Sequence, residues 1–172
     1  DYMPEVQEVT INAPEDGFIE GNISLRFPEV HVVTVSAGSM ISDGAFTLNF
    51  SKFFVNETAS SSFERGTLLY HTQQTTCLAF DATAAEVESA LEDLSLIGEG
   101  GVEVTRSGNG GASYDYGYSW TISFVGNDVA GNVPTLVTDN WNFTSHCTAF
   151  DVATNDPLVE AASINDGDAL GT

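Results

Sequence analysis

The sequence feature that most constrains the fold is an internal repeat near the N-terminus. Residues 4 to 13 read PEVQEVTINA and residues 28 to 37 read PEVHVVTVSA, so Pro, Glu, Val, Val, Thr and Ala recur at matching positions. After a shift of one residue, residues 21 to 27 (GNISLRF) match residues 44 to 50 (GAFTLNF), with Gly, Leu and Phe shared. The chain therefore contains a duplicated unit that is long enough for two strands.

Both copies alternate apolar and polar residues with the period of a β-strand. In the first strand of each copy, one face carries Val9, Ile11 and Ala13, which match Val33, Val35 and Ala37. In the second strand, Ile23, Leu25 and Phe27 match Phe46, Leu48 and Phe50. Each copy opens with Pro, which suits a strand start because its missing N–H is not needed there. If residues 28 to 37 open the main domain, residues 4 to 13 are a second strand with the same apolar face.

This additional strand has two uses. It can pair within its own chain, as part of a small divergent tandem domain, or it can leave and pair with the equivalent groove of another copy. Strand exchange is head-to-tail, so it produces an open filament unless the rotation closes a ring. We divide the chain into an N-terminal donor-strand arm or duplicated hairpin (1–27) and a β-sandwich domain (28–172). The predicted donor face consists of Val9, Ile11 and Ala13, flanked by Val6.

The rest of the chain is predicted to be mainly β with a single α-helix at about 83–96. Thr83 and Glu86 form a capping box, and Val87, Leu91 and Leu94 form the apolar stripe of that helix. Strands are expected at 102–106, 118–124 and around 135–139, 146–152 and 158–164, the last of which weakly resembles the repeated strand. Most of residues 52–65 is predicted to be a surface loop, and 67–71 with 75–80 a hairpin with Gln73 and Gln74 near its turn. The pattern predicts an Ig-like β-sandwich.

The charge excludes several classes of partner. The chain has 4 Lys and Arg against 25 Asp and Glu, a formal net charge of −21, with 42% hydrophobic residues that can supply a core. Such a surface repels phosphate backbones and anionic lipids, so we expect no nucleic-acid partner. The sequence contains no run of about 18 apolar residues, so we expect no membrane insertion. Subunits with this charge repel each other, and a polymer needs a strong, specific joint such as an inserted strand.

Several features predict an extracellular or cell-surface location. Cys77 and Cys147 lack the spacing of metal or thioredoxin-type sites, and they either form a disulfide or are two unrelated buried thiols. Four sequons place candidate N-glycans at Asn22, Asn49, Asn56 and Asn142. The alternative explanation of these sequons is strand alternation in a sequence rich in Asn and Thr.

Catalytic and metal motifs are missing from the sequence. His31, His71 and His146 lie in no hydrolase or metalloprotease frame, so we expect no enzyme, no catalytic residue and no cofactor. The acidic residues of the predicted helix suit a solvated face better than a metal site. Residues 165–168 (NDGD) offer oxygen ligands for Ca²⁺ but lack the spacing and distal Glu of an EF-hand, and a polar tail is the simpler interpretation. Acidic surface carboxylates could still bind Ca²⁺ weakly between subunits.

Five segments together resemble a known β-rich module. Residues 44–50, 76–94, 102–106, 118–124 and 131–136 are similar to a unit found in long tandem arrays of secreted surface proteins of protists and algae, and in some bacterial and phage proteins. The resemblance covers residues 28 to about 152 and implies no catalytic site. The N-terminal arm resembles, in its logic, the donor strands of bacterial pilus subunits, which complete the Ig-like fold of a neighbour.

Two functions follow as expectations. The first is a structural subunit of an extracellular pilus-like or mastigoneme-like filament, a helical homopolymer formed by inserting the N-terminal strand into a neighbour. The alternative is a monomeric carbohydrate-binding or adhesive module of a larger surface protein. That module would use exposed aromatic side chains, for which Tyr114, Tyr116 and Trp141 are candidates, although they could instead cap the ends of the sandwich.

Overall fold

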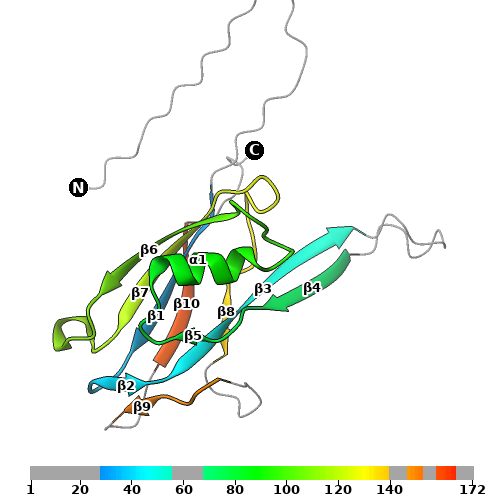
Figure 1. The fold of residues 1–172 in the computed structure, drawn as a ribbon. Coiled ribbons are helices and arrows are strands. Elements are labelled where there is room, and N and C mark those ends of the chain that lie inside the picture. Colours follow the sequence, from blue (N-terminus) through cyan, green and yellow to red (C-terminus); the bar gives the residue numbers. More distant parts are fainter. Residues whose placement is uncertain (1–27, 56–67, 140–146, 153–157, 166–172) are drawn as a thin grey trace, which may run out of the picture.

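The computed structural model describes residues 28–55, 68–139, 147–152 and 158–165 (Figure 1). They form a mainly β fold with one α-helix, as predicted from the sequence. In chain order the elements are β1 Val30–Ser36, β2 Ile41–Asp43, β3 Ala45–Val55, β4 Leu68–Gln74, β5 Leu78–Ala79, α1 Ala84–Glu92, β6 Val102–Gly108, the 3₁₀ turn η1 Ala112–Tyr114, β7 Tyr118–Phe124, β8 Val137–Asp139, β9 Asp151–Val152 and β10 Leu158–Asn165.

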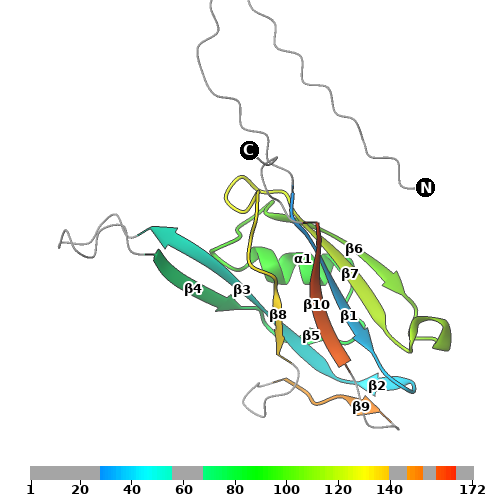
Figure 2. The same cartoon turned by 180° about the vertical axis from the view of Figure 1, so that it is seen from behind.

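Two antiparallel sheets make up the sandwich. One has the strand order β10-β1-β7-β6. In the other, β3 is central, with β4 and β5 along one edge and β8 along the opposite edge. Strands β2 and β9 form a short antiparallel pair at one end of the sandwich. Viewed from behind, the two sheets separate where β3 and β4 extend beyond the rest of the sandwich (Figure 2).

The core confirms the strand faces predicted from the repeat. Val33, Val35 and Ala37 at and after β1 are buried, and so are Phe46, Leu48 and Phe50 of β3. From β7, Trp120 and Phe124 meet the rings of Phe46 and Phe50 with centroids 5.5 and 5.6 Å apart. The indole N–H of Trp120 donates to the carbonyl oxygen of Ala82 (3.0 Å), so burial leaves that polar group satisfied.

Helix α1 begins where the capping box predicts. The backbone N–H and hydroxyl of Thr83 donate to Glu86 Oε2 (2.7 and 2.8 Å), and Glu86 N–H donates to Thr83 Oγ1 (3.2 Å). The backbone hydrogen bond from Thr83, then its hydroxyl and the Arg106 charge, lower the pKa of Glu86. Val87, Ala90 and Leu91 are buried against the sandwich. The helix ends at Glu92, earlier than predicted, and the turns that follow bury Leu94 and Ile97.

The predictions for residues 52–80 were partly wrong. Residues 52–55 belong to β3 rather than to a loop, and β4 continues through the predicted turn to Gln74. Strands β4 and β5 do not form a hairpin with each other, because both pair with β3. The physical reason is that Gln73 and Gln74 are held along the strand. The Gln73 amide bonds Leu96 N–H (2.9 Å) and Ser95 Oγ (2.7 Å), and Gln74 donates to Thr47 Oγ1 (3.0 Å).

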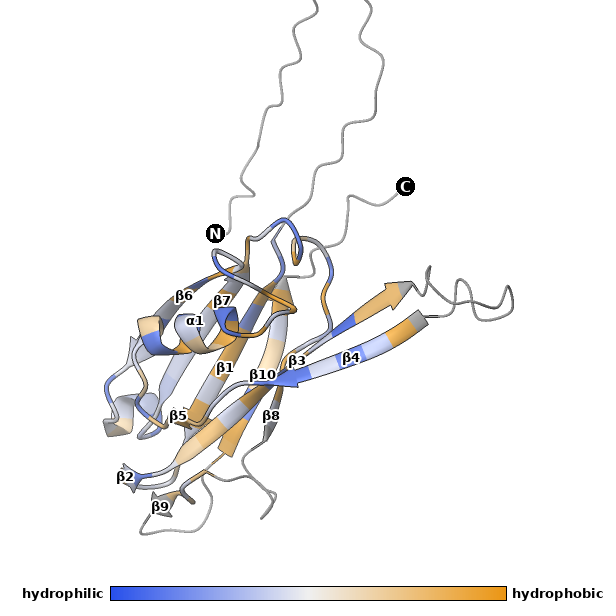
Figure 3. Ribbon diagram, turned by 45° about the vertical axis from the view of Figure 1, so that its right-hand side comes forward, coloured by the Kyte–Doolittle hydropathy of each residue, from blue (hydrophilic) through white to orange (hydrophobic). Residues whose placement is uncertain are grey.

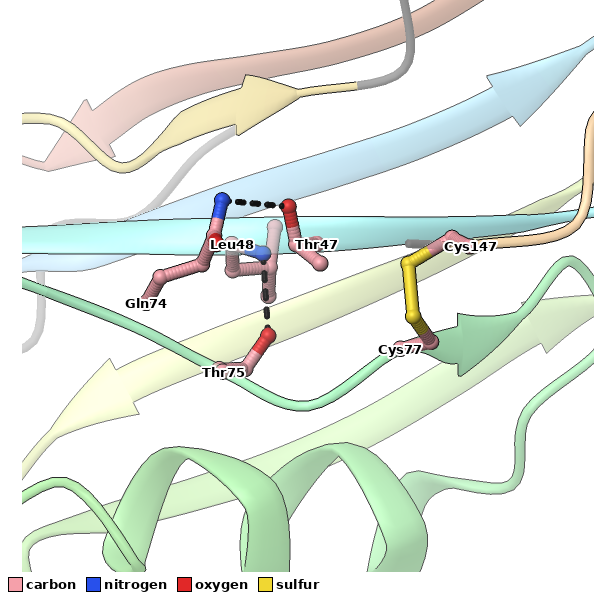
Figure 4. Close-up of a disulfide and its surroundings, with 6 residues drawn as sticks. All are labelled: Thr47, Leu48, Gln74, Thr75, Cys77 and Cys147. Atoms are coloured by element: carbon pink, nitrogen blue, oxygen red, sulfur yellow. Dashed lines mark hydrogen bonds between the residues drawn. A yellow bond between two sulfur atoms is a disulfide. The ribbon is translucent and has the colours of Figure 1, made fainter. Parts of the chain in front are cut away.

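A bulge separates β4 from β5. Between the pairs Asn49–Gln74 and Phe46–Leu78, the β4–β5 side has one residue more than β3. Figure 4 shows how Thr75 fills this interruption: Leu48 N–H donates to Thr75 Oγ1 (3.0 Å), while Thr75 N–H donates to the Leu48 carbonyl oxygen (2.9 Å). The hydroxyl replaces a ladder acceptor, so the irregular pairing leaves no buried donor unsatisfied.

Candidate functional site

The predicted donor strand lies outside the described residues, but its repeat partner is well placed. Val6, Val9, Ile11 and Ala13 belong to residues 1–27, for which no structure is given. Their matches Val33, Val35 and Ala37 lie on the buried face of β1 and just after it. Strand β1 is an inner strand, paired with β10 on one side and β7 on the other. The sequence repeated in residues 4–13 is thus that of a strand with neighbours on both edges.

Strand assembly depends on which sheet edges are open, and the β6 edge is covered. Helix α1 packs beside β6, and Glu88 Oε2 accepts a hydrogen bond from the Val104 N–H of that strand (2.9 Å). A carboxylate on an edge N–H occupies a donor that an incoming strand would need. Figure 1 shows the helix in front of the sheet that contains β6.

The opposite edge of the same sheet is β10, and β8 approaches it. Thr138 Oγ1 of β8 donates to the carbonyl oxygen of Val159 (3.0 Å). This contact joins the two sheets on the side of the sandwich away from α1. An acceptor on the outer edge of β10 is therefore already used within the chain.

The second sheet has a different kind of edge, at the far end of β3 and β4. We call residues 51–55 and 68–72 the ribbon. Its first residue pair is Ser51 and Thr72, whose hydroxyls are joined by a hydrogen bond (2.9 Å). Strand β8 pairs with β3 only at residues 47–49. Beyond Asn49, no described strand lies on that edge of β3, and none lies on the outer edge of β4. The ribbon projects from the sandwich (Figure 2).

The ribbon also exposes apolar side chains. Phe53 and Tyr70 face each other across the two strands, with ring centroids 4.8 Å apart, yet each is 56% exposed. Leu69, on the other face, is 41% exposed. Figure 3 shows apolar residues at the far ends of β3 and β4. Isolated two-stranded ribbons are marginally stable in water, so an apolar ribbon without a third strand gains from a partner.

The ribbon carries no acidic residue, although the chain has 25. Its charged side chain is Lys52, whose ammonium lies 5.4 Å from the Phe54 ring centroid and donates to the Asp128 carbonyl oxygen (2.5 Å). The His71 ring contacts Phe54 edge-on at 5.3 Å between centroids. With one cation and no acid, these residues carry a positive formal charge in a strongly acidic chain.

The two cysteines are joined. Cys77, just before β5, forms a disulfide with Cys147, which lies 70 residues further along the chain (Figure 4). Strand β3 lies between the two segments, since Phe46 pairs with Leu78 and Ala45 N–H donates to the Thr148 carbonyl oxygen (2.9 Å). The disulfide therefore links the two segments that flank β3, the central strand of the second sheet.

One of the four sequons can be placed. Asn49 lies inside β3, opposite Gln74 on one side and Val137 on the other, and its amide donates to the Val137 carbonyl oxygen (3.4 Å). Ser51, the hydroxyl residue of that sequon, is buried. Asn22, Asn56 and Asn142 lie outside the described residues. In the folded chain Asn49 is partly exposed, so glycosylation at this position stays a prediction.

A buried polar pair was missed in the sequence. His31 Nε2 lies 2.8 Å from Glu29 Oε1, Glu29 Oε2 accepts from Val133 N–H (2.5 Å), and His31 Nδ1 accepts from Leu136 N–H (3.5 Å). Both side chains are fully buried. Glu29 Oε2 and His31 Nδ1 each accept from a backbone N–H of this one segment, so the pair holds residues 133–136 against β1. The sequence signal for this pair is strand alternation, which places Glu29 and His31 of the Pro-Glu-Val-His run on the same face as Val33.

Other candidate ligands remain separate. His71 lies on the ribbon, and His146 lies outside the described residues. No group of three or more metal-binding side chains occurs in the described ranges, and the predicted weak Ca²⁺ segment falls beyond them except for Asn165. A shallow groove of about 380 Å³ lies between α1 and β5, beside Cys77 and Glu86. Its lining combines small apolar side chains with the polar side chains of Thr76, Glu86, Ser89 and Asp93.

The candidate aromatic residues of an adhesive site are only partly visible. Tyr114 is 51% exposed at the end of η1, and Tyr116 is partly buried in the same turn. Asp115 and Tyr116 both have positive φ, 47° and 54°, which is uncommon for residues other than glycine. Trp141 lies outside the described residues.

Among the described helices, none is long and apolar enough to cross a bilayer. A scan against models of protein families finds no match, and a search of curated proteins finds none either.

Proposed function

We propose that the protein is a structural subunit of an extracellular filament, in which each copy gives its N-terminal strand, residues 4–13, to a neighbouring copy. The single observation that carries the proposal is the match between this segment and β1. Positions equivalent to Val9, Ile11 and Ala13 are buried in an inner strand, so the segment carries the side-chain pattern of a strand that belongs inside a sheet.

The charge supports the same proposal. A chain with a net charge of −21 gains little from nonspecific association, so copies join only through a contact that is strong and directional. A donated strand supplies a ladder of backbone hydrogen bonds that does not depend on side-chain charge. The disulfide between Cys77 and Cys147 suits an oxidising environment such as the extracellular space.

The test is a pair of matched substitutions in the donor strand. Val9→Asp with Ile11→Asp places two charges on the apolar face and should abolish filaments while the domain stays folded. Thr10→Asp with Asn12→Asp adds the same charge to the opposite face and should leave filaments in place. Negative-stain microscopy and analytical ultracentrifugation measure assembly, and circular dichroism measures folding. Filaments that persist in the Val9 and Ile11 variant would refute strand donation.

A second function is favoured by one observation. Tyr114 is exposed beside two residues with positive φ, and strained turns of this kind are often found at binding sites. On this reading the chain is a carbohydrate-binding module that works as a monomer. Its test is retention on a panel of polysaccharide columns: the wild-type chain should be retained, and Tyr114→Ser should elute unretarded. A wild-type chain that no column retains would exclude this alternative.

A further inference from the structure

We infer that the ribbon, residues 51–55 and 68–72, is the surface that receives the donor strand of a neighbouring copy. This inference rests on the proposed function and adds the receiving site to it. The occupant is residues 4–13 of a second copy, which would lie along the open edge of β3 as a third strand.

The geometry of the edges favours the ribbon. The β6 edge is occupied by Glu88, and the β10 edge is contacted by Thr138. Strand β3 is covered by β8 only as far as Asn49. Residues with the same orientation as Asn49, such as Ser51 and Phe53, direct their backbone N–H and C=O groups to the side where no described strand lies. A strand added there would continue the line of β8.

The side chains of the ribbon fit the apolar face of the donor strand. A third strand beside β3 extends both faces of the ribbon, one carrying Phe53 and Tyr70 and the other carrying Lys52, Phe54 and Leu69. Val9, Ile11 and Ala13 alternate along one face of the donor strand. Set against Phe53 and Tyr70, they would cover the most exposed aromatic rings of the ribbon, and burial of that surface is favourable.

Charge complementarity indicates the same occupant, the donor strand of a second copy. Residues 1–13 contain Asp1, Glu5 and Glu8 and no Lys or Arg, whereas the ribbon contains Lys52 and no acid. If Val9 and Ile11 share a face with Phe53, then Glu8 and Thr10 share a face with Lys52, because successive residues of a strand point to opposite sides. The placement therefore brings Glu8 to the face of the cation. A slip of one residue would remove both matches at once.

The experiment uses the full-length Val9→Asp, Ile11→Asp chain, which cannot donate but can still receive. A fluorescent peptide of residues 1–13 with the wild-type sequence is titrated against it, and anisotropy gives the affinity. Phe53→Ser with Tyr70→Ser should weaken peptide binding at least tenfold. Met40→Ser is the control, because it removes an exposed apolar side chain away from the ribbon and should leave the affinity unchanged.

A charge exchange keeps the test independent of folding. Lys52→Glu should weaken binding of the wild-type peptide, and a peptide with Glu8→Lys should recover it on the Lys52→Glu chain but bind less well to the unsubstituted one. Such a reciprocal recovery cannot come from a misfolded ribbon. Equal binding of each peptide to both chains would overturn the assignment of faces and with it the inference.

The remaining outcomes separate this inference from the proposed function. If the peptide binds but is insensitive to every ribbon substitution, strands are donated to another site and only the ribbon is excluded. If the Val9→Asp, Ile11→Asp chain still dimerises through Phe53 and Tyr70, a second ribbon occupies the edge and the inference is wrong. If wild-type chains are monomeric and binding of the peptide is seen only after the arm is substituted, each arm occupies its own ribbon. If neither peptide binding nor polymer is seen, both proposals fail.

Discussion

At the residue scale, Gly117 shows how closely β1 and the turn before β7 approach each other. A Cβ atom at Gly117 would overlap the carbonyl oxygen of Val35. The turn is also fixed by a hydrogen bond from Ala37 N–H to the Asp115 carbonyl oxygen (2.8 Å). Because both contacts involve backbone, no side-chain movement relieves the overlap. The position accepts only a residue without Cβ.

We therefore predict that Gly117→Ala destabilises the domain by about 3 kcal/mol, since the β1–β7 pair must move apart to admit the methyl group. Urea unfolding followed by tryptophan fluorescence measures the change, as the buried Trp120 reports on β7. Gly98→Ala is the control: it has open space around the new atom but a φ of +76°, so it should cost only roughly 1 to 2 kcal/mol. Equal effects of the two changes would show that the Val35 contact is unimportant.

At the element scale, the sequence predicted elements with a strong local period and failed where pairing depends on distant residues. Strands β6 and β7, with the N-terminus of α1, were predicted because alternation and the capping box are local signals. The extent of β3 was not, because the apolar run at residues 53–55 adjoins a Ser-rich segment and is a strand only through its pairing with β4. The bulge at Thr75 and the Glu29–His31 pair depend on partners far along the chain.

The same reason explains what was predicted of the candidate site. The additional strand at residues 4–13 could be predicted, because a duplicated pattern can be recognised in the sequence itself. The receiving ribbon was not predicted. It is defined by where β8 stops pairing with β3 and by which faces Phe53 and Tyr70 share, and these facts exist only once the strands are in register.

Helix α1 gives a prediction about pH. Hydrogen bonds from Thr83, with the Arg106 charge, hold the pKa of Glu86 below its usual value. A lowered folded-state pKa contributes stability above the unfolded pKa, and this contribution is lost as the pH falls through the folded one. Wild type should thus be more stable than Glu86→Gln at neutral pH, and the gap should close in acid. Chemical denaturation from pH 7 to pH 2 measures it. A gap that stays constant over that range would contradict the assignment.

The disulfide gives a second prediction at this scale. Linking Cys77 to Cys147 closes a loop of 70 residues, for which the chain-entropy estimate is about 4 kcal/mol of stabilisation. Replacing both cysteines by serine should lower the free energy of unfolding by about that amount, measured by urea denaturation. Reductant should destabilise the wild type to the same level and leave the double variant unchanged. A variant as stable as the oxidised wild type would show that the second sheet holds without the bridge.

At the scale of the whole molecule, acidity and the ribbon act together. The acidic residues lie outside the ribbon, so another copy can approach the ribbon with little local repulsion. The attraction available there is small, because one exposed pair such as Lys52 with Glu8 contributes at most about 1 kcal/mol. Charge therefore decides where copies meet, and backbone pairing with apolar contact must supply the strength of the joint.

This balance predicts that salt promotes assembly. Two charges of −21 at about 40 Å in water repel by roughly 45 kcal/mol without screening, far more than the Lys52–Glu8 pair gains. The screening length falls from about 30 Å at 0.01 M salt to about 8 Å at 0.15 M, which removes nearly all of that repulsion. The critical concentration for polymerisation, measured by sedimentation, should thus fall as NaCl rises over this range. The Val9→Asp, Ile11→Asp chain is the control and should stay monomeric at every salt concentration, because screening removes a barrier but supplies no joint. Filaments of wild type that dissolve as salt rises would mean that ion pairs hold the copies together, contrary to a joint made of a donated strand.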